Sequence, residues 1–152
     1  MKKILVLVSV LFSLNAFSSQ YQLGVMLGEP TGISGKYQLG NNRSVDALLA
    51  YSLGDDLGLV IHADYLFEKA RSFNLGEFGP LDLYYGIGGR IVDLKHGKHK
   101  DELAIGPRAP IGLSYDLNNP NLQFFGELAI AFDLIPATDV DLEGGLGVRI
   151  RF

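Results

Sequence analysis

Three groups of residues in this 152-residue chain have types and spacings that could support chemistry. The first is GEPTGISGK at residues 28–36, whose glycines, hydroxyl groups and Gly-Lys ending look like a phosphate-binding loop. That loop requires glycine at position 30 and a serine or threonine directly after the lysine. Position 30 is Pro30, which has no N–H to offer a phosphate, and Tyr37 follows Lys36. The stretch is therefore not a phosphate-binding loop.

The second group is centred on His62, the only histidine that falls within a predicted strand. Asp64 lies two residues later on the same strand face, and we expect Ser44 on the neighbouring strand. A serine, a histidine and an acid can together activate a hydroxyl nucleophile. The alternative places His62 in an interior network of hydrogen bonds and ion pairs. We favour the network and predict no catalytic site, with a lipid-modifying enzyme using His62, Asp64 and Ser44 as the competing hypothesis.

The third group is KHGKHK at residues 95–100. His96 and His99 supply two metal ligands, which is fewer than a closed zinc site uses. The neighbouring lysines could contact the phosphates of lipopolysaccharide, but a solvated loop is the simpler interpretation. We predict no metal site and no cofactor, and the absence of cysteine excludes disulfides and thiol chemistry.

The first eighteen residues have the pattern of a secretory signal peptide. Lys2 and Lys3 precede an apolar run from residue 4 to 12, and small residues follow near position 18. We predict a signal peptide over 1–18, export through the Sec pathway, and one domain over 19–152. Removing the two lysines from 13 basic residues leaves 11 against 17 acidic residues, a net charge of −6. This acidic balance argues against a nucleic-acid partner.

Beyond residue 20, apolar residues recur with a period of two, which indicates β-strands. Most of these strands are longer than the roughly five or six residues of an average soluble strand, and match the roughly nine to eleven of a membrane-spanning one. The pattern predicts eight strands, at 20–28, 31–39, 43–53, 57–67, 80–91, 103–115, 122–134 and 139–152. Segments 68–79 and 92–102 are predicted loops. Segment 68–79 is long for a turn between two neighbouring strands. Either a hairpin therefore continues into it or the boundary of the preceding strand is misplaced.

The two faces of these strands differ in charge. One face carries Leu, Ile, Val, Phe and Tyr without charges, and the other carries the charges together with Gly, Ala and Ser. An eight-stranded barrel has an interior just wide enough for side chains. Rows of large apolar residues do not fit there, whereas small and charged residues do. We predict an all-β fold, an eight-stranded antiparallel transmembrane barrel that is apolar outside and polar or ionic inside.

Charges confined to a narrow interior must be paired. We expect Asp64 and Asp82 to flank Arg90, and Glu127 to lie beside Arg108. The interpretation is an ionic plug rather than an open channel. The predicted interior network comprises Lys36, Asp46, Asp64, Asp82, Arg90, Arg108, Glu127, Asp133, Asp141, Glu143 and Arg149.

The end of the sequence also carries a pattern. Val148, Ile150 and Phe152 alternate toward a terminal aromatic residue. This resembles the C-terminal assembly signal of bacterial outer-membrane barrels, and predicts the barrel-assembly machinery as a partner.

The whole predicted domain resembles, in architecture, the small outer-membrane barrels of the OmpA, OmpX and OmpW type. The stretches GEPTGISGKY, HADYLF, YGIGGR and DLIPAT look like a family of secreted barrel proteins of unassigned function. The resemblance implies a Gram-negative outer membrane, with its lipids and lipopolysaccharide as partners, and a structural or surface-interaction role. A soluble periplasmic barrel that binds an apolar ligand is a further alternative.

A gel experiment tests the closed barrel. We expect the unboiled, detergent-extracted protein to migrate differently from the boiled protein, because a closed barrel keeps its compact shape until heated. A chain that shows no heat shift and dissolves fully without detergent would instead favour the soluble ligand-binding barrel.

Overall fold

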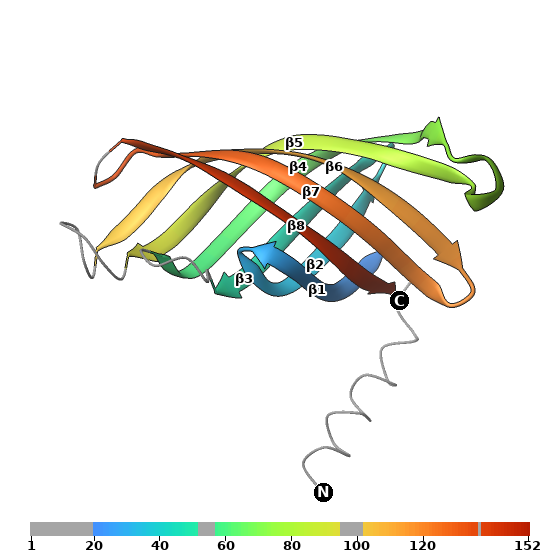
Figure 1. Cartoon of the computed structure of the whole chain (residues 1–152), viewed down its shortest axis with the longest axis horizontal. Helices are drawn as coiled ribbons and strands as arrows, with labels where there is room; N and C mark the ends of the chain where they lie inside the picture. The colour runs from blue at the N-terminus through green and yellow to red at the C-terminus, as the bar shows by residue number, and fades with distance from the viewer. Residues whose placement is uncertain (1–19, 52–56, 95–101, 137) are drawn as a thin grey trace, which may run out of the picture.

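Eight strands follow one another along the chain and pair with their sequence neighbours, and the first also pairs with the last (Figure 1). The computed structural model describes residues 20–51, 57–94, 102–136 and 138–152. The strands are β1 (Tyr21–Glu29), β2 (Thr31–Gly40), β3 (Arg43–Tyr51), β4 (Leu57–Asn74), β5 (Pro80–Leu94), β6 (Leu103–Asn118), β7 (Asn121–Asp133) and β8 (Asp139–Arg151).

All neighbouring strands are antiparallel, and β1 pairs with β8 from Gln22 opposite Arg151 to Glu29 opposite Gly144. The sheet therefore has no free edge among the described residues, and the predicted all-β, eight-stranded antiparallel barrel is confirmed. Within the described ranges, no helix is long and apolar enough to cross a membrane. The predicted signal peptide and the histidines of 95–100 lie outside the described residues.

Segment 68–79 is not a loop, and the first of the two alternatives is confirmed, because the hairpin continues into it. Strand β4 continues to Asn74, one 3-10 turn occupies Gly76–Phe78, and β5 begins at Pro80. The charged stretch after Phe67 breaks the alternation and looks like a loop, but it pairs with β5 in a hairpin that extends beyond the rest of the barrel wall (Figure 1). The register shifts between Lys69 and Phe73, where Arg71 has a φ of 53°. Residues 92–94, predicted to belong to the loop at 92–102, are part of β5, which runs to Leu94.

The stretch at residues 28–36 is a strand, a tight turn and a strand. Thr31 holds the turn, because its hydroxyl donates to the carbonyl oxygen of Gly28 at 2.8 Å and accepts from the N–H of Gly28 at 3.1 Å. The next turn contains Asn41 and Asn42, with φ of 54° and 60°. Two successive positive φ values suit a two-residue hairpin turn, and Asn tolerates them better than most residues do.

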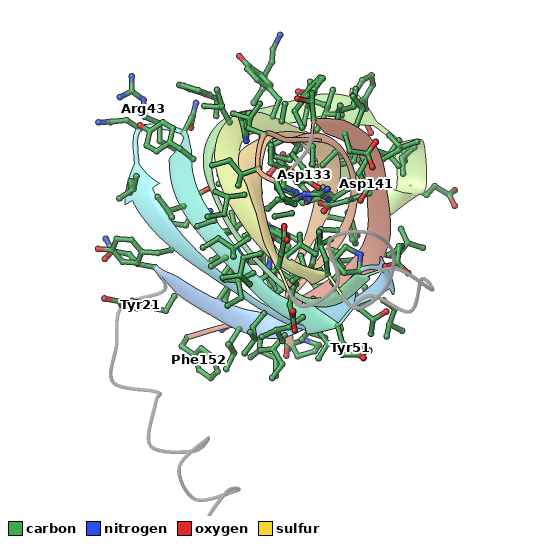
Figure 2. All side chains as sticks on the ribbon, turned by 90° about the vertical axis from the view of Figure 1, so that its left-hand side faces the viewer. Tyr21, Arg43, Tyr51, Asp133, Asp141 and Phe152 are labelled. Carbon is green, nitrogen blue, oxygen red and sulfur yellow. The ribbon has the colours of Figure 1, made fainter. Side chains whose placement is uncertain are left out.

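Adjacent residues along a strand alternate sharply in exposure. In β7, Leu128 is 59 % exposed, whereas Glu127 and Ala129 on either side are 5 % and 2 % exposed. Figure 2 looks into the barrel from the end opposite the chain termini, and shows Asp133 and Asp141 inside the ring of strands. Tyr21, Tyr51 and Phe152 lie on its outside.

The seam between β1 and β8 depends on a glycine, and we predict that Gly24→Ala destabilises the barrel. A Cβ at Gly24 would overlap the carbonyl oxygen of Val148, so the two strands would have to separate. We expect a loss of about 1–3 kcal/mol, measured by urea unfolding in detergent. Gly35→Ala is the matched control, because its Cβ would only approach the carbonyl oxygen of Gln22 at 3.9 Å. Equal losses for the two variants would contradict the tight seam.

Candidate functional site: an ion-pair network inside the barrel

Three arginines inside the barrel, in the space that we call the lumen, are almost completely buried. Arg90 on β5, Arg108 on β6 and Arg149 on β8 are 2 %, 1 % and 2 % exposed. A charged side chain is almost never buried to this extent unless it is paired. Each of the three guanidinium groups contacts at least one carboxylate, so the interior is built around three arginine-centred clusters.

Arg108 contacts three carboxylates from three other strands. Its Nε donates to Glu143 Oε2 and its Nη2 donates to Glu127 Oε1, both at 2.6 Å, and its Nη1 donates to Asp64 Oδ2. The second oxygen of Glu127 accepts from the Tyr84 hydroxyl at 3.0 Å. The arginine thereby ties β4, β7 and β8 to β6 across the lumen.

Arg90 holds a second cluster. Its Nε and Nη2 donate to the two oxygens of Asp133 at 3.0 and 2.8 Å, in a bidentate pair. Its Nη1 donates to Asp141 at 2.8 Å and to Glu143 at 2.6 Å. Glu143 thus bridges Arg90 and Arg108, one through each oxygen. A bidentate pair fixes the orientation of the guanidinium group as well as adding energy.

The predicted partners of Arg90 are wrong. Asp64 contacts Arg108 instead, and Asp82 accepts from the backbone N–H of Arg71 at 2.7 Å. Asp82 lies eight residues before Arg90 on the same strand, roughly 26 Å away at about 3.3 Å per residue. The alternation of inward and outward residues places both side chains on the inner face. It does not say how far apart they lie along the barrel axis.

Arg149 forms the third cluster, on the β8 side of the lumen. Its Nη2 donates to Asp46 Oδ2 at 3.0 Å and its Nε donates to Ser34 Oγ at 2.9 Å. The guanidinium carbon lies 3.8 Å from the centroid of the Phe125 ring, which is close enough for a cation–π contact. Gln123 accepts at the longer distance of 3.5 Å.

Lys36 pairs with Glu68, which lies in the segment predicted to be a loop. Glu68 also accepts from Ser44 Oγ at 2.8 Å and from Gln38 at 3.2 Å. Ser44 therefore does not serve His62, whose two ring nitrogens have no hydrogen-bond partner. Ser44, the serine of the alternative catalytic triad, therefore hydrogen-bonds to Glu68 and not to His62.

An apolar cluster fills much of the remaining lumen. Its members are Met26, Leu48, Ala50, Val60, Leu66, Tyr84, Val92, Ala104 and Phe125, each at most 4 % exposed. Several of them lie near the strand ends opposite the chain termini. The lumen is therefore filled by side chains, partly apolar and partly ionic.

Sequence reasoning did not include Glu68, Tyr84 or Ser34 in the network. The signal for Glu68 was present, because the inward positions Val60, His62, Asp64 and Leu66 continue by twos to residue 68.

The C-terminal residues of the predicted assembly signal lie in the seam with β1. Val148 and Ile150 pair with Val25 and Leu23 of β1, and the Phe152 N–H donates to the Tyr21 carbonyl at 2.9 Å.

Comparisons with protein-family models, curated proteins and solved structures find no match. The closed barrel agrees in architecture with the outer-membrane barrels that the sequence resembles, and no family is assigned. The fold is an all-β closed barrel with eight strands.

The three contacts of Arg108 predict an order of stability among substitutions. Arg108→Met leaves Asp64 and Glu127 without a cation and leaves Glu143 with Arg90 alone, so we expect a loss of about 3–5 kcal/mol in urea unfolding in detergent. Glu127→Gln leaves Arg108 with two carboxylates and should cost less, about 1–3 kcal/mol. Adding Glu127→Gln to Arg108→Met should restore little, because Asp64 stays unpaired and Glu143 keeps only its contact with Arg90.

The control for this series is Asp116→Asn. Asp116 pairs with Arg151 at 3.5 Å near the strand ends, where both side chains are partly exposed, so we expect a loss of at most about 1 kcal/mol. If Arg108→Met unfolded at the same urea concentration as Asp116→Asn, the network would be hydrated rather than a packed plug.

Proposed function

We propose that this protein is an integral outer-membrane β-barrel of a Gram-negative bacterium. The observation that supports this proposal is the exposed surface of the strands. Large apolar side chains from all eight strands are exposed, including Leu27, Ile33, Leu49, Ile87, Ile111, Leu128 and Leu146. A soluble monomer rarely exposes an apolar patch larger than a few hundred Å². A lipid environment removes this conflict, because hydrocarbon is the natural solvent for such a face.

Aromatic residues on the exposed face lie where a lipid–water interface would be. Tyr21 and Tyr37, on paired strands near the chain termini, have ring centroids 4.8 Å apart. Further round the same end, Phe67 lies 5.3 Å from Tyr65 and 5.8 Å from Tyr85. Tyrosine rings favour this interface, because one end of the ring is apolar and the other forms hydrogen bonds.

The filled lumen supports a structural or surface-interaction role rather than transport. An apolar ligand, as in a soluble carrier barrel, would have to displace paired charges and buried apolar residues. An open channel generally needs more than eight strands. The surfaces left for function are the lipid-facing belt and the two ends of the barrel. The partners of the proposal are outer-membrane lipids and lipopolysaccharide, together with the machinery that inserts such barrels.

The lipid-facing belt is tested by the same substitution at two depths. Leu128 lies in the middle of β7 and is 59 % exposed, and Leu75 lies at the turn of the β4–β5 hairpin and is 52 % exposed. We expect Leu128→Arg to cost about 2–4 kcal/mol in lipid vesicles and Leu75→Arg to cost about 0–1 kcal/mol. Urea unfolding of the reconstituted protein measures both.

Similar exposure makes Leu75 a matched control for Leu128. In water, an exposed leucine can become arginine with little change in stability at either position. Two near-neutral substitutions, in a protein that stays in solution without detergent, would replace the membrane proposal with a soluble barrel.

A further inference from the structure

Two aspartates lie opposite each other on adjacent strands inside the barrel. Asp46 on β3 is the direct register partner of Asp64 on β4, and both side chains point inward. Like charges in directly opposed positions destabilise a sheet. Here the pair is also shielded from water, since Asp46 and Asp64 are 2 % and 1 % exposed. A cation between the two carboxylates would remove the repulsion.

His62 completes a set of three potential ligands. It lies two residues before Asp64 on the same face of β4 and is 3 % exposed. One ligand atom from each of Asp46, His62 and Asp64 lies within 4.8 Å of the others. The ligand atoms of a tetrahedral zinc ion, each bonded at about 2.1 Å, lie about 3.4 Å apart. The three groups are therefore near enough for side-chain rotation to bring one atom of each onto a single ion.

Four buried atoms of these three residues have no hydrogen-bond partner in the protein. Asp46 Oδ1, Asp64 Oδ1 and both ring nitrogens of His62 are buried without a hydrogen bond. His62 Nδ1 is 3.1 Å from Asp64 Oδ2, but that oxygen already accepts from Arg108 and the contact lacks hydrogen-bond geometry. Buried polar groups are nearly always satisfied, so this concentration of unpaired atoms calls for a ligand.

The charge of the lumen is also unbalanced. Among the described residues, four buried cations, Lys36, Arg90, Arg108 and Arg149, face five buried anions, Asp46, Asp64, Glu127, Asp133 and Glu143. The partly buried Glu68 and Asp141 add two further negative charges to the same network. With His62 neutral, the network has three more negative charges than positive ones. A divalent cation would offset most of this excess.

We propose that Asp46, His62 and Asp64 bind a divalent first-row transition metal ion inside the barrel. One imidazole nitrogen and two carboxylate oxygens form a mixed donor set that suits zinc and its neighbours better than calcium or magnesium. The site does not involve His96 or His99, and was not predicted from the sequence. Because all three ligands are buried, the ion has a structural role, linking β3 to β4.

The arginine clusters would orient these ligands. Asp46 is held through Oδ2 by Arg149, and Asp64 is held through Oδ2 by Arg108. In both residues the oxygen left over is Oδ1, the atom without a partner. Outer-sphere hydrogen bonds of this kind fix the direction of metal-binding carboxylates. The ion-pair network and the metal site would thus be two parts of one arrangement.

The test is zinc retention by the full chain. The protein is unfolded in urea with a chelator, refolded in detergent with Zn²⁺, freed of loose metal by desalting, and analysed by elemental mass spectrometry. We expect one Zn²⁺ per chain, and about 100-fold less unfolding at equilibrium when free Zn²⁺ is about 100 times its Kd. The variants His62→Gln and Asp46→Asn should lose the bound zinc. The control His96→Gln/His99→Gln should keep it.

If a variant fails to form the heat-shifted barrel, a second measurement on the parent protein tests the site without it. Co²⁺ bound to the parent protein should give visible absorption bands of a low-coordinate site with nitrogen and oxygen ligands, and Zn²⁺ should displace it. The proposal is overturned if the folded parent protein retains no Zn²⁺ and no Co²⁺. It is also overturned if zinc binding is lost only in the His96→Gln/His99→Gln variant, or if nitrogen NMR shows His62 protonated on both ring nitrogens in the presence of excess Zn²⁺.

Discussion

The contact between Arg108 and its three carboxylates links most of the lumen. Asp64, Glu127 and Glu143 come from β4, β7 and β8, and each places a negative charge where water is excluded. The guanidinium group donates to all three at once, because its donors point outward in one plane. Glu143 extends the linkage to Arg90, so four strands besides β6 depend on one connected set of ion pairs.

Barrel closure and the ionic lumen depend on each other. With β1 paired to β8, every strand has two neighbours and the interior becomes narrow. A narrow interior cannot hold large apolar side chains from every strand, so most of these side chains point outward. The charged residues are then confined to a space where only pairing makes their burial tolerable. The same geometry explains both the ion pairs and the apolar exterior on which the membrane proposal rests.

The cluster of Asp46, His62 and Asp64 stands apart from this pattern of satisfied charges. Asp46 and Asp64 each meet an arginine through Oδ2 only. Their Oδ1 atoms and both ring nitrogens of His62 have no hydrogen-bond partner. The hydroxyl needed for a catalytic triad is absent from this cluster, because Ser44 donates to Glu68. A bound cation accounts for the arrangement better than a nucleophile does.

The sequence by itself determined the strands, their order and the two faces of each strand, because a period of two assigns alternate side chains to opposite sides. It did not determine partners across the lumen. Arg90 and Asp82 share the inner face of β5 but lie eight residues apart along it, and Arg90 meets Asp133, Asp141 and Glu143 instead. The charged stretch containing Glu68 likewise became part of β4 through pairing with β5. Strand register and the position of each residue along the barrel axis are fixed together only in the closed tertiary structure. These two quantities decide which charged side chains contact one another.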